Sequence, residues 1–227
     1  MNEYFKLEKQ DGVATLTFDR DEKRNPLNEH SIAELEANLI AVRSDADVRA
    51  LLITGTGRAF CAGADISRLK GVSDPAERHR LFSTASPRAR QVLRRTLAML
   101  KDIELPTVSA VNGFAVGGGW FLALACDLRI AVEGAEFWLP EVDLGAPGPR
   151  GPEQWMAAHV GAARAKEITF TCRHFKADEL YQWGLLNRVV KREELMPVAL
   201  ELARSLAAKN HAAIVQAKAQ INGFFLE

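Results

Sequence analysis

The chain has 227 residues, which is enough for one domain with a sizeable core. Lysine plus arginine and aspartate plus glutamate both total 29, so the formal net charge is zero, and this argues against nucleic acid as the main partner. The N-terminus has no apolar signal core, no apolar run reaches membrane-spanning length, and the 3 cysteines are widely spaced. A cytoplasmic protein with reduced thiols and no membrane segment is therefore expected.

Periodicity along the chain predicts strands that alternate with helices in the first two-thirds, followed by mainly helical segments. Asp11-Gly12 lies between two alternating runs and is a hairpin signal. Asn28 is a helix N-cap before an apolar face, and the run from Trp120 to Cys126 is apolar on every side, which predicts a buried helix. The expected strands cover 4–10, 13–18, 49–54, 107–111 and 128–132, and the expected helices begin at 28, end near 101, and cover 120–126, 153–159, 162–171, 177–183, 192–207 and 211–222. This order indicates an α/β fold with a helical C-terminal part.

Two small-residue segments, Ala59 to Ile66 and Val111 to Gly119, each follow a strand-like run and precede a helical one. At a strand-to-helix turn the first backbone N–H groups have no intrahelical partner. Two such turns side by side would direct two N–H groups at one oxygen, as in an oxyanion hole, and would suit charge on a thioester carbonyl. The triple glycine 117–119 matches neither a dinucleotide-binding nor a P-loop pattern. Taken alone, it favours a tight turn that lets a buried helix approach its strand over a functional role.

Glu141 is the candidate proton-transfer group. It lies in the apolar stretch 137–143, just before a Gly/Pro-rich loop, and partial burial there would raise the pKa of its carboxyl above the usual value of about 4.3. The alternative is a solvated acid at the edge of the loop, or a cap for the next segment. Asp143 is the next candidate base, whereas Asp65 lies in an expected first helical turn and favours a capping role.

Other charged clusters are less informative. The arginines between 78 and 95 form the densest positive region, which is either a solvated helix face or an anion subsite. The histidines show no metal-ligand spacing, so no metal is expected. The sequence contains no Gly-x-Ser-x-Gly, which argues against a serine hydrolase of the usual α/β kind.

The order and spacing of several motifs make the chain resemble the crotonase (enoyl-CoA hydratase/isomerase) superfamily over nearly its whole length. The matching segments are 21–28, 60–66, 106–119 with 125–127, and 139–145. The resemblance implies a spiral of ββα units, expected over residues 1–190. It also implies a helical C-terminal segment, expected over 191–227 and shorter than usual, that assembles trimers or dimers of trimers. The implied substrates are coenzyme A thioesters, with no separate cofactor.

The resemblance also implies roles for single residues. Ala64 and Gly118 would be the backbone N–H donors of the oxyanion hole, and Glu141 the catalytic acid. The residues expected to bind substrate are Lys23, Arg24, Ala62, Asp65, Ile66, Phe121 and Trp138. Family hydratases carry a second catalytic glutamate at the position of Phe121.

A single carboxylate suffices to move a double bond, because the same base removes a proton from one carbon and returns it at another. Hydration benefits from two such groups. The sequence therefore favours an isomerase-like enzyme of fatty acid metabolism, with slow hydration of crotonyl-CoA. The alternatives are an acyl-CoA decarboxylase, a hydratase–lyase, or a catalytically idle acyl-CoA-binding or assembly subunit. The acyl group stays open, as does the carrier, coenzyme A or an acyl carrier protein.

Overall fold

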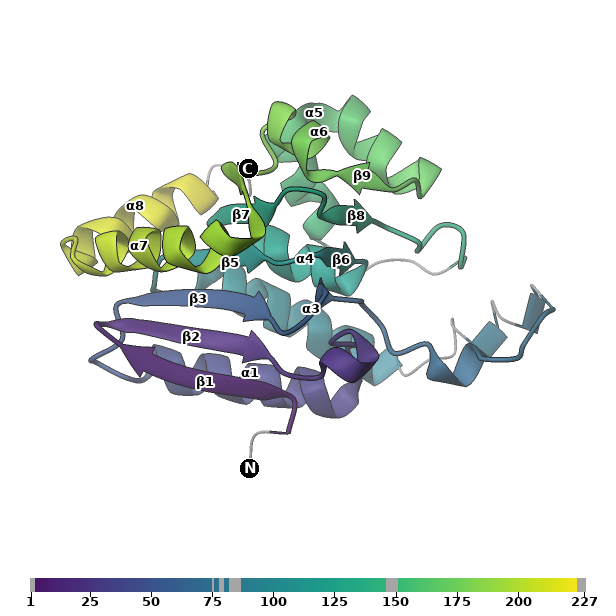
Figure 1. Cartoon of the computed structure of the whole chain (residues 1–227), viewed down its shortest axis with the longest axis horizontal. Coiled ribbons are helices and arrows are strands. Elements are labelled where there is room, and N and C mark those ends of the chain that lie inside the picture. Colours follow the sequence, from purple (N-terminus) through teal and green to yellow (C-terminus); the bar gives the residue numbers. More distant parts are fainter. Residues whose placement is uncertain (1–2, 75, 78–79, 82–86, 146–150, 224–227) are drawn as a thin grey trace.

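Two β-sheets form the centre of the molecule in the computed structural model, which describes residues 3–74, 76–77, 80–81, 87–145 and 151–223 (Figure 1). The larger sheet has the order β1-β2-β3-β5-β7-β10, in which β1 and β2 are antiparallel and the other neighbours are parallel. Its strands are β1 (Phe5–Gln10), β2 (Val13–Phe18), β3 (Ala50–Gly55), β5 (Thr107–Val111), β7 (Leu128–Val132) and β10 (Arg188–Val190). The smaller sheet has the order β4-β6-β8-β9, with strands β4 (Ala59–Cys61), β6 (Phe114–Val116), β8 (Glu136–Trp138) and β9 (Phe175–Lys176).

From β3 to β8, consecutive strands contribute alternately to the two sheets, so that β3, β5 and β7 lie in the larger sheet and β4, β6 and β8 in the smaller one. A helical segment follows each pair before the next begins. This repetition is the expected spiral of ββα units, and both it and the α/β class are confirmed. The strands of the smaller sheet were missing from the sequence prediction, because a strand of two or three residues is too short to show an alternating pattern.

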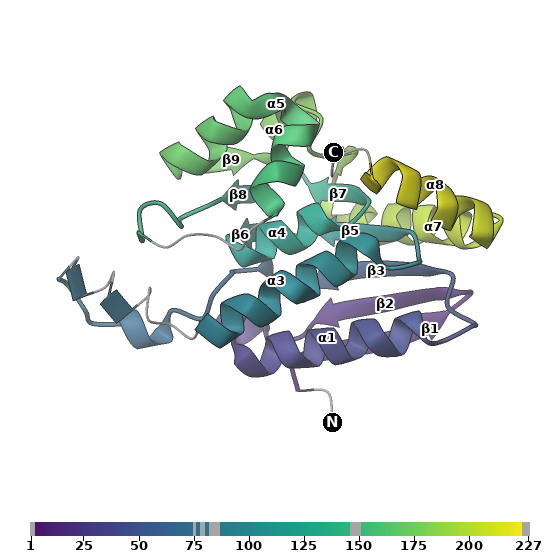
Figure 2. The same ribbon diagram turned by 180° about the vertical axis from the view of Figure 1, so that it is seen from behind.

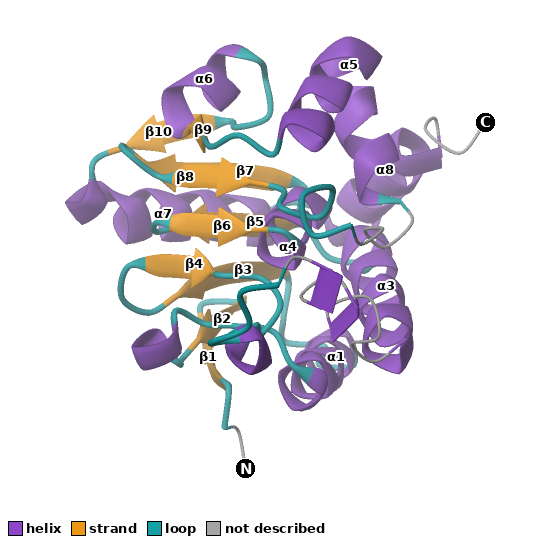
Figure 3. Cartoon of the chain, turned by 90° about the vertical axis from the view of Figure 1, so that its right-hand side faces the viewer, coloured by secondary structure: helices purple, strands orange, loops and turns teal. Residues whose placement is uncertain are grey.

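Helices cover both faces of the larger sheet (Figures 2 and 3). Helices α1 (Glu29–Arg43), α3 (Pro87–Asp102) and α4 (Gly118–Ala125) lie on one side, and α7 (Leu195–Ala207) packs on β2, β3, β5 and β7 from the other. The N-cap of α1 is a capping box, in which Ser31 N–H donates to Asn28 Oδ1 and Asn28 N–H to Ser31 Oγ, both at 2.8 Å. All residues of α4 are buried, as its apolar sequence predicts.

Other helices among the described residues are α5 (Pro152–Thr171), α6 (Ala177–Gln182) and α8 (His211–Gly223), and short 3₁₀ turns are η1 (Asp21–Lys23), η2 (Ser67–Leu69) and η3 (Arg192–Glu194). Gly161, with φ of 79°, breaks α5 into the two parts that the sequence predicts. In the part of the chain that the structure describes, no helix combines the length and the apolar character needed to cross a membrane.

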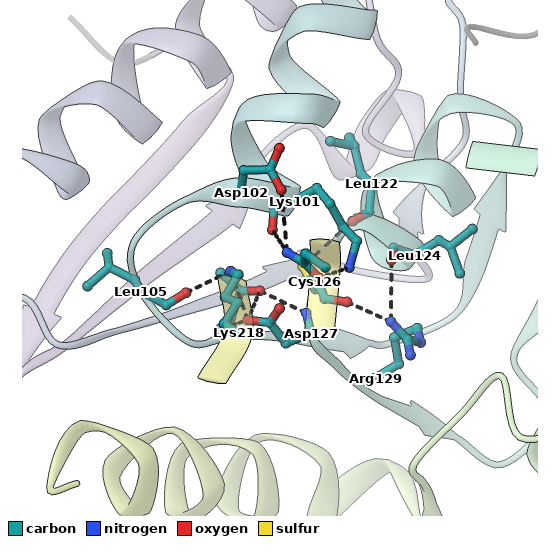
Figure 4. Close-up of polar contacts among 11 residues, drawn as sticks. Lys101, Asp102, Leu105, Leu122, Leu124, Cys126, Asp127, Arg129 and Lys218 are labelled. Atoms are coloured by element: carbon teal, nitrogen blue, oxygen red, sulfur yellow. Dashed lines mark hydrogen bonds and ion pairs between the residues drawn. The ribbon is translucent and has the colours of Figure 1, made fainter. Parts of the chain in front are cut away.

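Helix α8 is held by polar contacts rather than by burial of apolar side chains (Figure 4). The Lys218 ammonium donates to Leu105 O at 2.9 Å and lies 3.0 Å from Asp127 Oδ2. Lys101 Nζ donates to Asn222 Oδ1 at 2.6 Å, and Asn222 Nδ2 returns a hydrogen bond to Lys101 O at 3.0 Å. These contacts fix α8 to the end of α3 and to the segment that leads into β5.

Candidate active site

The first turn of the site is held against the loop that precedes α1. Leu27 N–H donates to Gly63 O at 2.7 Å, and Asp65 N–H donates to Leu27 O at 2.8 Å, so that Leu27 and Ala64 form a parallel bridge. In such a bridge the N–H of the central residue points away from its partner strand. The Ala64 N–H therefore faces the opposite side, and no described residue accepts a hydrogen bond from it.

The second turn joins β6 to α4. Gly117 has φ of 49° and ψ of −117°, a conformation that residues with a Cβ rarely adopt, and its N–H donates to Trp138 O at 3.0 Å. Gly118 is the first residue of α4, so its N–H has no partner within the helix. No acceptor for this N–H is found among the described residues.

The two turns are in contact. A Cβ on Gly63 would lie 2.5 Å from Val116 O and 3.6 Å from Gly118 N, which shows how closely the backbones approach. A Cβ on Gly118 would lie 2.9 Å from Leu27 Cδ1 and 3.3 Å from Leu93 Cδ2. The α-carbon of Gly118 thus faces two leucine side chains, and its nitrogen lies next to the turn that carries Ala64. Gly118 is buried, whereas Ala64 is exposed.

Glu141 lies directly over the second turn. A Cβ on Gly117 would lie only 2.5 Å from Glu141 Oε1, so the absence of a side chain there makes room for the carboxyl. Glu141 Oε2 is buried, and no described residue forms a hydrogen bond with it. Burial, with a further contribution from the negative charge of Glu153, raises the pKa of Glu141 from 4.5 to about 7. A carboxyl with such a pKa exchanges protons readily near neutral pH.

Several residues expected to bind the coenzyme A portion lie in or beside the first turn. Ala62 N–H donates to Arg24 O at 3.0 Å, and Lys23 and Arg24 are exposed. Burial opposes the ionisation of Asp65, but hydrogen bonds from Ser67 and the positive charge of Lys23 nevertheless lower the pKa of Asp65. Ile66 is 51% exposed. The backbone of Asp65 precedes η2 rather than a longer helix, and its carboxylate accepts from Ser67 N–H at 2.9 Å, which is a local capping contact.

Two other residues predicted to contact substrate have well-defined neighbours of their own. Phe121 is 1% exposed and belongs to the main hydrophobic core. The Trp138 ring stacks on His174, with ring centroids 4.0 Å apart and an interplanar angle of 8°, and meets Phe114 edge-on. The two ring contacts of Trp138 do not involve Ala64, Gly118 or Glu141. For Trp138, the link to the site is its backbone O, which accepts from Gly117 N–H.

A separate groove of about 680 Å³ lies along the exposed face of α3. It is lined by Arg88, Gln91, Val92, Arg94, Arg95, Ala98 and Trp155. The three arginines are exposed, and Arg95 forms a two-pronged ion pair with Glu36 at 2.6 and 2.7 Å. This arrangement agrees with the interpretation of the arginines as a solvated helix face. Some of the other arginines considered with them, such as Arg78, lie outside the described residues. The residues that line the groove belong to neither of the two turns and do not include Glu141.

The profile described as "Enoyl-CoA hydratase/isomerase" matches residues 8–224 of the chain. The chain belongs to this family. The short-chain-enoyl-CoA hydratase of Clostridium acetobutylicum is 38% identical over 217 residues, which cover 95% of this chain and 80% of that protein. Among solved structures, an enoyl-CoA hydratase from Bacillus anthracis superposes with a TM-score of 0.85 at 32% identity, over 97% of this chain and 83% of that one. A monofunctional enoyl CoA isomerase from M. smegmatis superposes with a TM-score of 0.83 at 27% identity, over 100% of this chain and 95% of that one.

Sequence reasoning missed one residue of this region, Glu153. It lies in the first turn of α5 and is half-buried, and burial raises the pKa of its carboxyl. The sequence places it at the start of a predicted helix, and nothing local to it indicates that its charge acts on Glu141.

Proposed function

We propose that the protein binds an enoyl-CoA thioester and moves a proton on its enolate. The thioester carbonyl oxygen accepts hydrogen bonds from the N–H groups of Ala64 and Gly118, and Glu141 carries the proton. The observation that supports this most directly is the Glu141 carboxyl over Gly117, immediately before the Gly118 donor, with one oxygen buried and unbonded among the described residues. A base next to the donors of an oxyanion hole is the minimum needed to form an enolate.

The leading reaction is migration of a double bond from C3 to C2 of the acyl chain. Glu141 as the carboxylate removes a proton from C2, and the electrons of the C–H bond move toward the thioester oxygen. The same carboxyl then returns the proton to C4, which leaves the double bond conjugated with the carbonyl. Phe121 supports this choice, because a buried phenyl ring cannot transfer a proton. The reaction neither gains nor loses electrons, so the proposed mechanism calls for no redox cofactor.

Water addition to a 2-enoyl-CoA is the second candidate. One observation favours it: the negative charge of a second carboxylate, Glu153, raises the pKa of Glu141. Decarboxylation, a hydratase–lyase reaction and an idle binding subunit are the other outcomes that a substrate screen distinguishes. We also propose that the chain assembles as a trimer, which sedimentation would test.

The decisive experiment measures proton exchange at C2 of bound acyl-CoA thioesters in heavy water, together with conversion of a 3-enoyl-CoA to its 2-enoyl isomer. We expect both reactions in the wild type. In Glu141→Gln both should fall by roughly 10²-fold or more, while binding of the thioester changes little. An acyl-CoA that binds tightly without exchange or turnover in the wild type would show an idle subunit and refute the proposal.

A further inference from the structure

Two buried asparagines meet at one backbone carbonyl, Ala59 O. Asn25 Nδ2 donates to this oxygen at 2.8 Å and Asn112 Nδ2 at 3.3 Å. The two residues are 2% and 7% exposed. Asn25 lies in the loop between β2 and α1, Asn112 directly follows β5, and Ala59 begins β4. One oxygen therefore joins three separate segments of the chain. We call these two residues the asparagine clamp.

Each asparagine makes further hydrogen bonds with the backbone. Asn25 Nδ2 also donates to Thr56 O at 3.1 Å, and Asn25 Oδ1 accepts from Arg20 N–H at 2.8 Å. Asn112 Nδ2 also donates to Gly57 O at 3.0 Å. Asn112 Oδ1 is buried, and no described residue donates a hydrogen bond to it, which lowers stability. An apolar side chain would avoid this loss, so the contribution of Asn112 lies in the bonds that it donates.

The carbonyl of Ala59 stands where a β-bulge begins. Strand β4 pairs with β6 in the smaller sheet (Figure 3), and Ala59 and Cys61 lie opposite consecutive residues of β6. Phe60 is therefore an extra residue on β4. A bulge bends its strand and changes the direction in which the chain leaves the sheet. Because Ala64 follows only three residues after β4, the direction of its N–H depends on how this bulge is held.

Glycines let the backbone segments come together around the clamp. A Cβ on Gly55 would lie 2.5 Å from Ala59 O and 2.9 Å from Asn25 Nδ2. A Cβ on Gly113 would lie only 2.0 Å from Arg58 O. The backbones can approach this closely because both positions lack a side chain, and the hydrogen bonds of the clamp fix the segments at that separation.

The clamp is connected to both turns of the site. Asn112 precedes β6, which ends at the turn that carries Gly118. Asn25 is two residues before Leu27, whose backbone is hydrogen-bonded to the first turn. We propose that the asparagine clamp positions the oxyanion hole, by holding the bulge of β4 so that the N–H groups of Ala64 and Gly118 converge on one thioester oxygen. The inference rests on the proposed function, because it concerns the same two donors.

Both asparagines are positioning residues, since they act through the backbone of the first turn rather than on the reacting atoms. The stabilisation of charge by an N–H group depends on its distance from the oxygen and on its direction. A misplacement of about 1 Å is enough to lower a rate by roughly 10²-fold. Loss of the clamp should therefore slow the reaction without removing either donor.

The test uses the variants Asn25→Gly and Asn112→Ala. Asn25 has φ of 55°, which glycine adopts without strain, so Asn25→Gly removes the side chain and leaves the backbone conformation accessible. Asn38→Ala is the matched control, because Asn38 is 6% exposed and its Nδ2 donates to Glu34 O at 2.9 Å within α1. The control should lower stability but leave turnover unchanged. Rates are measured per folded molecule, below the temperature at which unfolding begins.

Two measurements separate positioning from a purely structural role. The first is kcat and KM for double-bond migration in a 3-enoyl-CoA. We expect kcat to fall roughly 10- to 10²-fold in Asn25→Gly and in Asn112→Ala, with KM changed by less than about threefold, because the bonds to the oxygen strengthen in the transition state. The second is the ¹³C resonance of the thioester carbonyl in bound butyryl-CoA labelled at C1, which moves downfield as hydrogen bonds polarise the carbonyl. This displacement should shrink in both variants and keep its wild-type value in Asn38→Ala.

The inference is wrong if folded Asn25→Gly keeps the kcat and the carbonyl resonance of the wild type. It is also wrong if the three asparagine variants lose activity only in proportion to their unfolded fraction. If Asn25→Gly does not fold, the same two measurements on Asn112→Ala decide. A wild type that binds butyryl-CoA without displacement of the resonance, and shows neither turnover nor exchange at C2, would instead refute the proposed function itself.

Discussion

Replacing Glu141 by Gln should remove activity and, at the same time, stabilise the folded protein at neutral and alkaline pH. The carboxyl has an ordinary pKa of 4.5 and a pKa of about 7 in the folded state, and its oxygen Oε2 is buried without a hydrogen-bond partner among the described residues. The folded state therefore holds the proton more tightly than the unfolded chain. Below pH 4.5 the carboxyl is protonated in both states and there is no difference. As the pH rises from 4.5 through 7, ionisation favours the unfolded chain, and stability that is present in acid is lost.

The size of this effect follows from the two pKa values. A rise from 4.5 to about 7 corresponds to about 3 kcal/mol, because each pKa unit is worth about 1.36 kcal/mol. Glutamine of the same shape has no charge to bury, so the difference in unfolding free energy between Glu141→Gln and wild type should grow by about that amount between pH 4.5 and pH 8. Urea unfolding over a pH series measures it, with Glu201→Gln as the control. A difference that stays constant with pH would show that Glu141 is not desolvated in the folded protein, and the reasoning for its role as a base would fail with it.

The other predictions concern the second turn and the last helix. Gly118→Pro removes the N–H donor, whereas Gly118→Ala also adds a Cβ but keeps the donor. Turnover by the proline variant should therefore be roughly 10²–10³-fold lower than turnover by the alanine variant. Equal rates in the two variants would exclude the donor role. Gly117→Ala should lose activity and about 1–3 kcal/mol of stability, because the new Cβ would lie 2.5 Å from Glu141 Oε1 and the backbone conformation is unfavourable for alanine. Calorimetry measures the stability and a turnover assay the activity. A fully active variant would contradict the contact between Gly117 and Glu141. Lys218→Met should speed amide hydrogen exchange in α8 and lower the free energy of unfolding by about 1–3 kcal/mol, because the ion pair to Asp127 is lost. Unchanged exchange over residues 211–223 would show that α8 is held in another way.

The sequence by itself determined the features that depend on neighbours along the chain. Asp11 and Gly12 adopt the positive φ angles, 54° and 75°, that the two-residue hairpin requires. Asn28 caps α1, and the uniformly apolar run at Trp120 becomes a helix buried on every side. These signals are reliable because a turn, a cap or an all-apolar helix is specified within a few residues. The motif order was equally informative, since it indicated the family that the comparison confirmed.

Only the tertiary structure decided which of these local features meet. The Cβ-free position at Gly117 makes room for Glu141, which is 24 residues further along the chain, and that contact depends on the pairing of β6 with β8. The charge of Glu153 acts on Glu141 in a fold where α5 packs against α4, and the Trp138 ring stacks on His174 because β8 pairs with β9. Neither contact leaves a pattern in the sequence. The physical reason is that burial, and the shift in pKa that follows from it, depends on all the atoms around a side chain, and most of these come from distant segments brought together by the crossovers between the two sheets.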